Sequence, residues 1–580
     1  MKENEEKMPT PKQIEKEISE FLSKRFGTNV RMVSPFVIPQ EATLEQAEEP
    51  PKKKKKISFD LKPEDLISYL DQYIVKQDSA KAILSTKICT HFNRIRRFES
   101  TPDDISGMVG RIKNNVLMLG PTGVGKTYII KLIAKKIGVP FVKGDATKFS
   151  ETGYVGGDVE DLVRDLVREA DDDIELAQYG IIYIDEIDKI ASSRNLIGAD
   201  VSRTGVQRGL LKPMEETEVD LKVPHDPISM IQEIDRFRKT GEREKRSVNT
   251  GNILFIMSGA FTDLPRIIKK RLTQQRIGFG AHITDSHEET AILDHLKSED
   301  LIEYGFESEF VGRLPVRAVF ETLTGDDLFQ ILRNPGNPII LGKKLDFSAY
   351  GIDVKFEDPV LRILAKNAFE ENTGARGLVS AVEKALLLFE KKLPSTSVKK
   401  FPVTISVIQN PEMSLEKLME PSHRIEIDKI FESLSDEEKR CIKEYIASHK
   451  TYIAEKHSLT MTPSRMDIAA TYYTRHTMDV DNVISRIKTY CDEIKQIELR
   501  FFKSHDINIV LEEDAIDFIV EQVVNFDVNL DDFYSELSDG FEHGLKLIRE
   551  KTGKNRFFIT RQALLDPESY ISALIKKAIF

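Results

Sequence analysis

The stretch Gly120-Pro121-Thr122-Gly123-Val124-Gly125-Lys126-Thr127 is the part of the sequence that decides the fold. It follows the apolar run 115–119 and leads directly into residues 128–134, whose apolar side chains have helical spacing. Glycines let the backbone curl, so that successive N–H groups and the positive end of the helix can surround a polyphosphate. Lys126 then reaches the outer phosphates, and the Thr127 hydroxyl can ligate Mg²⁺. This strand, loop and helix predict a nucleotide site rather than a chance glycine-rich turn.

A second chemical motif is an acidic pair at the end of an apolar run. Residues 180–184 have the pattern of a buried strand, which ends in Asp185 and Glu186. An aspartate at this position beside a phosphate loop can hold Mg²⁺. Glu186 is placed to orient and deprotonate an attacking water, as a general base in hydrolysis must. The alternative is a simple helix cap, and the phosphate loop favours the catalytic interpretation.

Short apolar runs alternate with helical patterns between residues 115 and 257. Such alternation predicts an α/β fold, with a parallel sheet covered by helices on both faces. Upstream, residues 10–26 have the spacing of a short amphipathic helix. Residues 34–56 combine prolines, acidic residues and five consecutive lysines, which is typical of a flexible linker.

Composition restricts the class of function. A chain of 580 residues has room for about three or four domains of ~150 residues each. Its net charge of −11 argues against a protein whose main role is binding nucleic acid. We find no apolar run of membrane-spanning length and no secretory signal after the charged N-terminus, so we expect a cytoplasmic protein without a membrane segment. The three cysteines, Cys89, Cys441 and Cys491, are far apart, so we expect no zinc site.

Four segments together resemble the ClpX family of AAA+ protein unfoldases. They are the phosphate loop, the strand and acidic pair at 181–188, Gly153-Tyr154-Val155-Gly156, and Gly374-Ala375-Arg376-Gly377-Leu378. The resemblance covers residues 62–405 almost without a break. It implies a large AAA+ P-loop NTPase domain followed by a small α domain, with ATP and Mg²⁺ as cofactors. It also implies homo-hexameric rings that thread polypeptide substrates through a central pore.

The resemblance assigns further residues to the nucleotide. Phe310-Val311-Gly312-Arg313-Leu314-Pro315 resembles the segment that carries the arginine finger. Arg313 is therefore expected to reach the nucleotide of the neighbouring subunit and stabilise charge on the γ-phosphate. Arg376 matches the sensor-2 arginine of the small domain, and Ser258 matches the sensor-1 position. A helix-capping arginine is the alternative for Arg313 and for Arg376. The expected catalytic residues are Lys126, Glu186 and Arg313.

The base of the nucleotide is assigned to an apolar segment near residue 74. Ile74 and Val75 match the family residues that cradle adenine. The glycine that follows them in the family is Lys76 in this sequence, which departs from the pattern.

The segment from Gly153 to Gly156 resembles the first pore loop of the family. Tyr154 and Val155 would provide an aromatic and aliphatic pair that grips polypeptide without regard to its sequence, while the flanking glycines permit movement. A tight turn with a buried tyrosine is the alternative. The second pore loop of the family carries a compact basic cluster, whereas residues 218–250 are longer and of mixed charge here. Recognition of the usual C-terminal degradation tag is therefore not expected from the resemblance.

An apolar tripeptide, Ile277-Gly278-Phe279, stands in a polar stretch. Exposed apolar anchors of this kind mark a partner pocket, and the segment resembles the loop by which ClpX docks on the peptidase ClpP. A buried hairpin tip is the alternative. The related HslU has a similar pore-loop sequence, but its large inserted domain has no room in this chain. The cysteine-rich zinc domain of the family is also absent before Cys89.

The C-terminal third lies beyond the resemblance. Residues 424–503 are rich in helical patterns, and Ile507-Asn508-Ile509-Val510-Leu511-Glu512-Glu513 echoes Ile352-Asp353-Val354-Lys355-Phe356-Glu357-Asp358. A second, degenerate copy of the small domain and a chance recurrence of strand and helix are equally compatible with this echo. In such a copy Asp531 stands where Arg376 does.

The predicted organisation has five parts. They are an N-terminal helix and linker (1–61), the AAA+ large domain (62–322), the small domain (323–408), a mainly helical extension (409–505) and the possible repeat (506–580). The predicted function is ATP-driven unfolding of polypeptides that are fed to a ClpP-type peptidase. The alternatives are a peptidase-independent remodelling chaperone and a nucleotide-switched scaffold with little turnover.

Overall fold

A computed structural model describes residues 59–100, 113–149, 158–191, 201–221, 247–275, 288–526 and 528–579. The pore-loop residues Tyr154 and Val155, the docking tripeptide 277–279 and the N-terminal helix and linker lie outside the described residues. Within the described ranges no helix is both long and apolar enough to cross a membrane.

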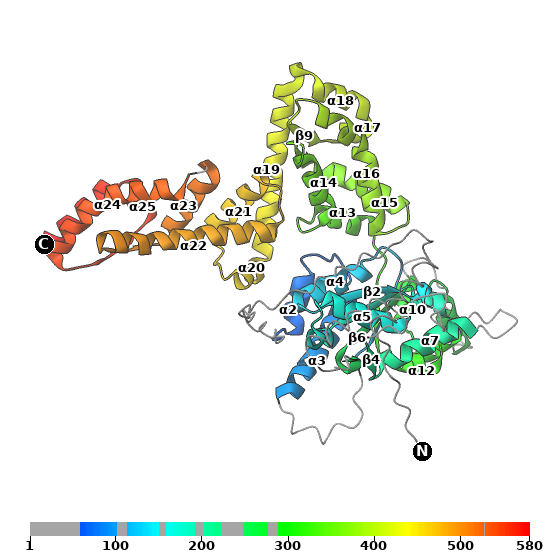
Figure 1. The fold of residues 1–580 in the computed structure, drawn as a ribbon. Helices are drawn as coiled ribbons and strands as arrows, with labels where there is room; N and C mark the ends of the chain where they lie inside the picture. Colours follow the sequence, from blue (N-terminus) through cyan, green and yellow to red (C-terminus); the bar gives the residue numbers. More distant parts are fainter. Residues whose placement is uncertain are drawn as a thin grey trace, which may run out of the picture.

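The core of the first half is a five-stranded sheet, and all of its pairings are parallel, as predicted (Figure 1). In spatial order the strands are β2 (Phe141–Asp145), β3 (Ile181–Asp185), β6 (Leu254–Gly259), β1 (Val116–Leu119) and β7 (Val316–Val319). The strand β1 lies between β6 and β7, and the strand order changes direction there: β1 is followed in the chain by β2 on the β6 side, whereas β7 on the other side is reached from β6. Ligands bind at such switch points, outside the carboxyl ends of the strands. The phosphate loop begins at that end of β1.

Alternate residues of each strand face different cores. Val116 and Met118 of β1 belong to the core beneath α2 (Pro63–Leu70), α3 (Asp78–Ser100) and α4 (Lys126–Ile137). Leu117 and Leu119 belong to the opposite core. The helices on that side are α5 (Val159–Glu169), α6 (Ile174–Ala177), α7 (Val201–Met214), α9 (Leu264–Gln275), α11 (Ser298–Tyr304) and α12 (Ser308–Gly312). The sheet is therefore buried on both faces, which explains its near-continuous apolar strands.

The second part of the chain is a smaller unit that packs on the first. Its elements are α13 (Gly325–Arg333), α14 (Pro338–Ser348), β8 (Asp353–Phe356), α15 (Asp358–Glu370), α16 (Ala375–Lys392), β9 (Lys400–Val403), α17 (Ile405–Gln409) and α18 (Pro411–Met419). Its buried residues, such as Phe389 and Phe401, belong to the same core cluster as α2, α3 and α4. The two units therefore share apolar contacts.

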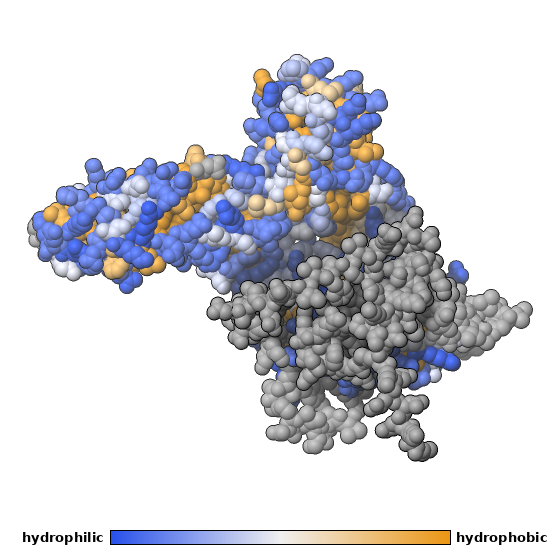
Figure 2. Space-filling model, in the orientation of Figure 1, coloured by the Kyte–Doolittle hydropathy of each residue, from blue (hydrophilic) through white to orange (hydrophobic). Residues whose placement is uncertain are grey.

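The C-terminal part forms an arm with its own core, which contains residues from Ile442 to Ala563 (Figure 1). It consists of α19 (Arg424–Ser448), α20 (Lys450–His457), α21 (Pro463–Arg475), α22 (Val480–His505), β10 (Asn508–Leu511), α23 (Glu513–Phe526), α24 (Leu530–Thr552), β11 (Arg556–Ile559), α25 (Arg561–Leu565) and α26 (Pro567–Ile579). The face of the arm shown in Figure 2 is largely hydrophilic, with scattered apolar side chains.

The elements from α21 to α26 repeat the order of those from α13 to α18. In each set a pair of helices precedes two short strands that pair in parallel. Equivalent backbone hydrogen bonds fix both pairs: Asp353 N–H donates to Lys399 O at 2.8 Å, and Asn508 N–H donates to Asn555 O at 3.1 Å. The correspondence begins at α21, which is earlier in the chain than the echo found in the sequence. Asp531 pairs with Arg500 at 2.6 Å.

A buried charge network fixes the arm to the smaller unit. Glu438 of α19 accepts from Lys344 of α14 and, at 2.6 Å, from Lys355 of β8. Lys355, only 3% exposed, also donates to the carbonyl of Thr474 in α21 at 2.7 Å. Burial acts to raise the pKa of Glu438, but the two lysines hold it below its ordinary value. Each charge in this network is therefore paired.

We predict that Glu438→Ala lowers the free energy of unfolding by about 3 kcal/mol, because it leaves buried Lys344 without its counter-charge and leaves buried Lys355 with only Asp353, at 3.9 Å. Urea unfolding followed by circular dichroism, with hydrogen exchange over α19 and α21, measures this loss. The matched control is Glu437→Ala, which removes the exposed neighbouring carboxylate. Equal effects of the two substitutions would contradict the prediction.

Candidate nucleotide site

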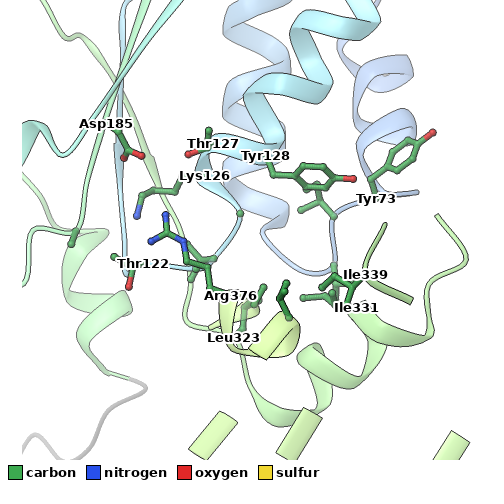
Figure 3. A pocket seen from close by; sticks show the side chains of 18 of the residues that line it. Tyr73, Thr122, Lys126, Thr127, Tyr128, Asp185, Leu323, Ile331, Ile339 and Arg376 are labelled. Carbon is green, nitrogen blue, oxygen red and sulfur yellow. The ribbon is translucent and has the colours of Figure 1, made fainter. Parts of the chain in front are cut away.

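A cavity of about 410 Å³ opens where the phosphate loop, the end of the sheet and the smaller unit meet (Figure 3). One end is lined by apolar and aromatic side chains, and the other by charged and hydroxyl groups. The apolar end contains Ile74, Val75, Tyr128, Leu323, Ile331 and Ile339. The polar end contains Thr122, Lys126, Thr127, Asp185, Glu186, Asp188 and Arg376. The pocket thus has separate environments for an apolar ring and for a charged group.

The phosphate loop has the curled backbone that its glycines predict. Gly120, Gly123 and Gly125 all have positive φ, at 146°, 77° and 96°. A Cβ atom on Gly123 would lie 2.1 Å from the carbonyl oxygen of Thr373 in the smaller unit, so no other residue fits there. Thr122 to Thr127 line the pocket directly. The loop leads into α4, whose N-terminus favours an anion.

The Lys126 ammonium is folded back over its own loop. Its Nζ donates to the carbonyl of Gly120 at 2.5 Å and to that of Pro121 at 2.7 Å. Burial lowers the pKa of Lys126 to about 8, against the opposing effect of Asp185 and Asp188. A phosphate in the loop offers this cation a stronger partner than two neutral carbonyls.

Asp185 lies at the carboxyl end of β3 and is held from two sides. Ser258 of β6 donates its Oγ–H to Asp185 Oδ1 at 2.6 Å, and Lys143 of β2 lies 2.8 Å from Oδ2. Burial acts to raise the pKa of Asp185, but these two partners lower it below its ordinary value. The carboxylate is therefore ionised and fixed in orientation. Ser258 is buried and does not itself line the pocket, where β6 and its end contribute Gly259 and Ala260.

Tyr183 connects the phosphate loop to Asp185. Thr127 donates to the Tyr183 hydroxyl at 3.1 Å, and that hydroxyl lies 2.6 Å from Ser258 Oγ. Since Ser258 donates its proton to Asp185, Tyr183 is the donor to Ser258. Burial raises the pKa of Tyr183 to about 12, so it keeps this proton. The result is a continuous chain of hydrogen bonds from Thr127 to Asp185.

Tyr183 and Lys143 were not among the site residues predicted from the sequence. Tyr183 carried a usable signal, because a tyrosine inside an otherwise apolar strand needs a partner for its hydroxyl. Lys143 carried none, since its approach to Asp185 depends on the pairing of β2 with β3, in which Lys143 lies opposite Tyr183. The apolar residues Leu323, Ile331 and Ile339 also depend on how the smaller unit packs.

Glu186 follows Asp185 in a left-handed backbone conformation, with φ of 58°. Its side chain is exposed at the pocket. Non-glycine residues in this conformation are uncommon and cluster at functional sites. Asp188, 7% exposed, accepts from the Ala260 amide at 3.3 Å and ties the turn to the end of β6.

The segment after Ile74 and Val75 is tied to the junction between the two units. Lys76 stands at the family's glycine and has φ of 62°, which costs about 1 kcal/mol for a side chain. Lys76 Nζ donates to Thr322 O at 2.9 Å. Gln77 exchanges two hydrogen bonds with the backbone of Glu321, both at 2.8 Å. These contacts offset the strain and hold the apolar end of the pocket against residues 321–322.

The two arginines expected from the resemblance lie in different places. Arg376, in the first turn of α16, points toward Lys126 (Figure 3). Arg313 does not reach the pocket of its own chain. Its carbonyl accepts from Asn115 at 3.2 Å, at the opposite end of β1 from the phosphate loop, and its half-exposed guanidinium pairs with Glu215.

The residues present fit a magnesium nucleoside triphosphate. The Thr127 hydroxyl and the ionised Asp185 are oxygen ligands of the kind that Mg²⁺ prefers. Lys126 and Arg376 provide positive charge for phosphates, and the apolar end with Tyr128 suits a base. The fold and the site together define a P-loop ATPase of the AAA+ class.

Comparison with known proteins agrees with this class. Residues 111–317 match the family model described as AAA domain (Cdc48 subfamily), and residues 324–392 match the C-terminal, D2-small domain, of ClpB protein. Two relatives carry the name ATP-dependent Clp protease ATP-binding subunit ClpX. The Treponema denticola protein is 39% identical over 342 residues, which cover 58% of this chain and 79% of the relative. The Borrelia duttonii protein is 40% identical over 351 residues, covering 60% and 78%.

The chain therefore belongs to the ClpX family of AAA+ ATPases. It hydrolyses ATP and couples hydrolysis to the unfolding of proteins, as the resemblance found in the sequence implied.

We predict that Tyr183→Phe lowers kcat for ATP about tenfold and leaves nucleotide affinity within about threefold. The substitution removes the hydroxyl that joins Thr127 to Ser258 while keeping the ring in place, and a hydrogen bond of this kind is worth about 1 kcal/mol. Steady-state ATPase rates and binding of a fluorescent ATP analogue measure the two effects. Tyr304→Phe, away from the pocket, is the control. An unchanged kcat would contradict a role for the chain of hydrogen bonds from Thr127 to Asp185.

Proposed function

We propose that this chain is the motor subunit of a homo-hexameric unfolding machine that delivers polypeptides to a ClpP-type peptidase. The observation that supports this most strongly is the convergence of Lys126, Asp185, Glu186 and Arg376 on one pocket. A scaffold that only binds nucleotide has no use for a fixed carboxylate and an exposed general base beside the phosphate loop. The predicted cytoplasmic location is part of this proposal.

The roles of the pocket residues follow from their chemistry. Lys126 and Arg376 bind the negative charge of the phosphates. Thr127 and Asp185 would hold Mg²⁺, which supplies further charge neutralisation when it is bound. Glu186 accepts the proton of the attacking water. Ser258 and Tyr183 keep Asp185 and Thr127 in fixed orientations, so these groups need little rearrangement during the reaction.

Arg313 supports a ring rather than an isolated subunit. It lies at the far end of β1 from its own pocket and is half exposed, so it would complete the pocket of a neighbour by exchanging Glu215 for the nucleotide there. An arginine supplied in this manner is worth ~10³ to 10⁵ in rate in GTPases. Hydrolysis would then depend on assembly into the hexamer.

We propose the division into a large domain (62–322) and a small domain (323–408) with the hinge at residues 321–323. Arg376 belongs to the small domain and contacts the pocket, so the state of the nucleotide biases the angle between the domains. This movement would drive the pore-loop residues Tyr154 and Val155 along a polypeptide. Residues 463–579 are proposed to be a degenerate second small domain, because their elements and strand pairing repeat those of 325–419.

The peptidase part of the proposal rests on two observations. The relatives are named as ATP-binding subunits of an ATP-dependent Clp protease. The tripeptide Ile277-Gly278-Phe279 supplies an apolar anchor in a polar stretch of sequence. We assign this tripeptide to peptidase docking.

Glu186→Gln is expected to bind ATP normally and to hydrolyse it about 10² to 10⁴ times more slowly, because the amide cannot accept the proton of water. ATPase rates and equilibrium binding of ATP to the full chain test this. Glu299→Gln, an exposed carboxylate on α11, serves as the control. Equal slow hydrolysis by wild type and Glu186→Gln would favour the nucleotide-switched scaffold.

Phe279→Ala is expected to abolish binding to a ClpP-type peptidase while ATPase activity stays within about twofold, since we assign this side chain to the partner and not to the nucleotide. Co-sedimentation with the peptidase and degradation of a model substrate measure the loss. Leu387→Ala, which removes an apolar side chain that is 63% exposed, is the control. A wild-type chain that unfolds substrates but never binds the peptidase would favour the peptidase-independent chaperone.

A further inference from the structure

The C-terminal arm contacts the large domain as well as the small one. The hydroxyl of Tyr73 donates to Asp481 Oδ2 of α22 at 3.1 Å. Lys136 of α4 donates to the hydroxyl of Tyr452 in α20 at 3.3 Å. The same ammonium lies 5.1 Å from the ring centre of Tyr69 and 5.0 Å from that of Tyr452. The arm therefore meets the large domain through specific polar and cation–π contacts.

Two of the large-domain elements that the arm touches lead to the nucleotide pocket. Tyr73 lines the pocket and directly precedes Ile74 and Val75. Lys136 is in the last turn of α4, the helix that begins with the phosphate-loop residue Lys126. A contact at Tyr73 thus acts on the apolar end of the pocket directly, through the α2–α3 connection to which Ile74 and Val75 also belong.

Tyr73 lies where three parts of the chain meet. Its ring packs edge-on against Tyr69 of α2, with 5.2 Å between ring centres. The connection between α13 and α14 passes on another side, where a Cβ on Gly336 would lie 3.4 Å from the ring. Asn334 of that connection also donates to the carbonyl of Gln72 at 2.7 Å. These contacts involve the ring and the backbone, whereas the Tyr73 hydroxyl donates to Asp481 of the arm.

Contacts within the arm fix the charge and position of Asp481. Asp481 is in the first turn of α22, where a helix favours negative charge. Lys456 of α20 pairs with it, and His457 Nε2 lies 3.3 Å from Oδ1. Burial acts to raise the pKa of Asp481, but these partners and Tyr73 hold it well below its ordinary value. Tyr73 therefore donates to an ionised acceptor whose position is set by the arm itself, which makes a strong hydrogen bond.

We propose that Asp481 is a positioning residue of the nucleotide pocket, which sets the affinity for ATP by anchoring Tyr73 and with it the segment that receives the base. This inference rests on the proposed assignment of the pocket to ATP. The arm is fixed to the small domain through Glu438, Lys344 and Lys355. The Tyr73–Asp481 hydrogen bond therefore links the large domain to the small one through the arm, beside the direct hydrogen bond from Asn334 to Gln72.

The test compares Asp481→Ala, Asp481→Asn, Tyr73→Phe and the double variant Tyr73→Phe/Asp481→Ala in the full chain. We expect Asp481→Ala to raise KM for ATP, and Kd for a fluorescent ATP analogue, about threefold to tenfold, with kcat within about twofold. Asp481→Asn restores most of the affinity, because its amide oxygen still accepts from Tyr73 although the ion pair with Lys456 is lost. The double variant has the same affinity for ATP as Tyr73→Phe, since both substitutions remove the same Tyr73–Asp481 hydrogen bond.

The control is Asp467→Asn, which removes a carboxylate that pairs with Lys439 and Lys443 within the arm, both at 3.1 Å. Thermal unfolding of each variant separates affinity from stability. The inference is overturned if Asp481→Ala and Asp467→Asn have the same KM, if Asp481→Asn is as impaired as Asp481→Ala, or if the effects of the Tyr73 and Asp481 changes add. A wild-type chain without saturable ATP hydrolysis would instead overturn the assignment of the pocket.

Discussion

The arrangement of the site depends on one close contact between two backbones. Gly123 of the phosphate loop and Gly374 before α16 approach so closely that a Cβ on either would lie within 3 Å of the other segment. The amide of Ala375 donates to the carbonyl of Gly123 at 2.8 Å. Because this contact sets the first turn of α16 on the loop, Arg376 comes to lie beside Lys126. The small domain thus reaches the phosphates through backbone as well as through charge.

At the other end of the pocket the contacts are made by side chains and involve a third part of the chain. Tyr73 meets α2, the α13–α14 connection and Asp481, while Glu438 ties α19 to the small domain. The phosphate end is closed by two parts of the chain and the base end by three. A change in the angle between the domains must therefore alter the base end and the arm together. The proposed domain movement would therefore act on the arm as well as on the pocket.

Sequence predicts the features that are local. Short continuous patterns predict the phosphate loop, Asp185 at the end of a strand and the parallel sheet. Arg376 could be placed through the resemblance to ClpX. Tyr183, Lys143 and Asp481 act across 56, 42 and 408 positions of the chain, on Thr127, Asp185 and Tyr73 respectively. Their roles depend on strand order and domain packing, which no local period encodes. The four-residue strand β7 was also missed, because its place in the sheet depends on strand order.

The repeated unit in the arm shows why one copy serves the nucleotide and the other does not. Gly374 has φ of 62° and ψ of −146°, a conformation essentially restricted to glycine, and this lets the backbone lie against the phosphate loop. Asn529 stands at the equivalent place with an ordinary φ of −75° and caps α24 with its own side chain. Asp531, in place of Arg376, pairs with Arg500 of the same unit. The second copy therefore satisfies its own helix end and charge internally, and it contacts the pocket instead through Asp481 of its helix α22.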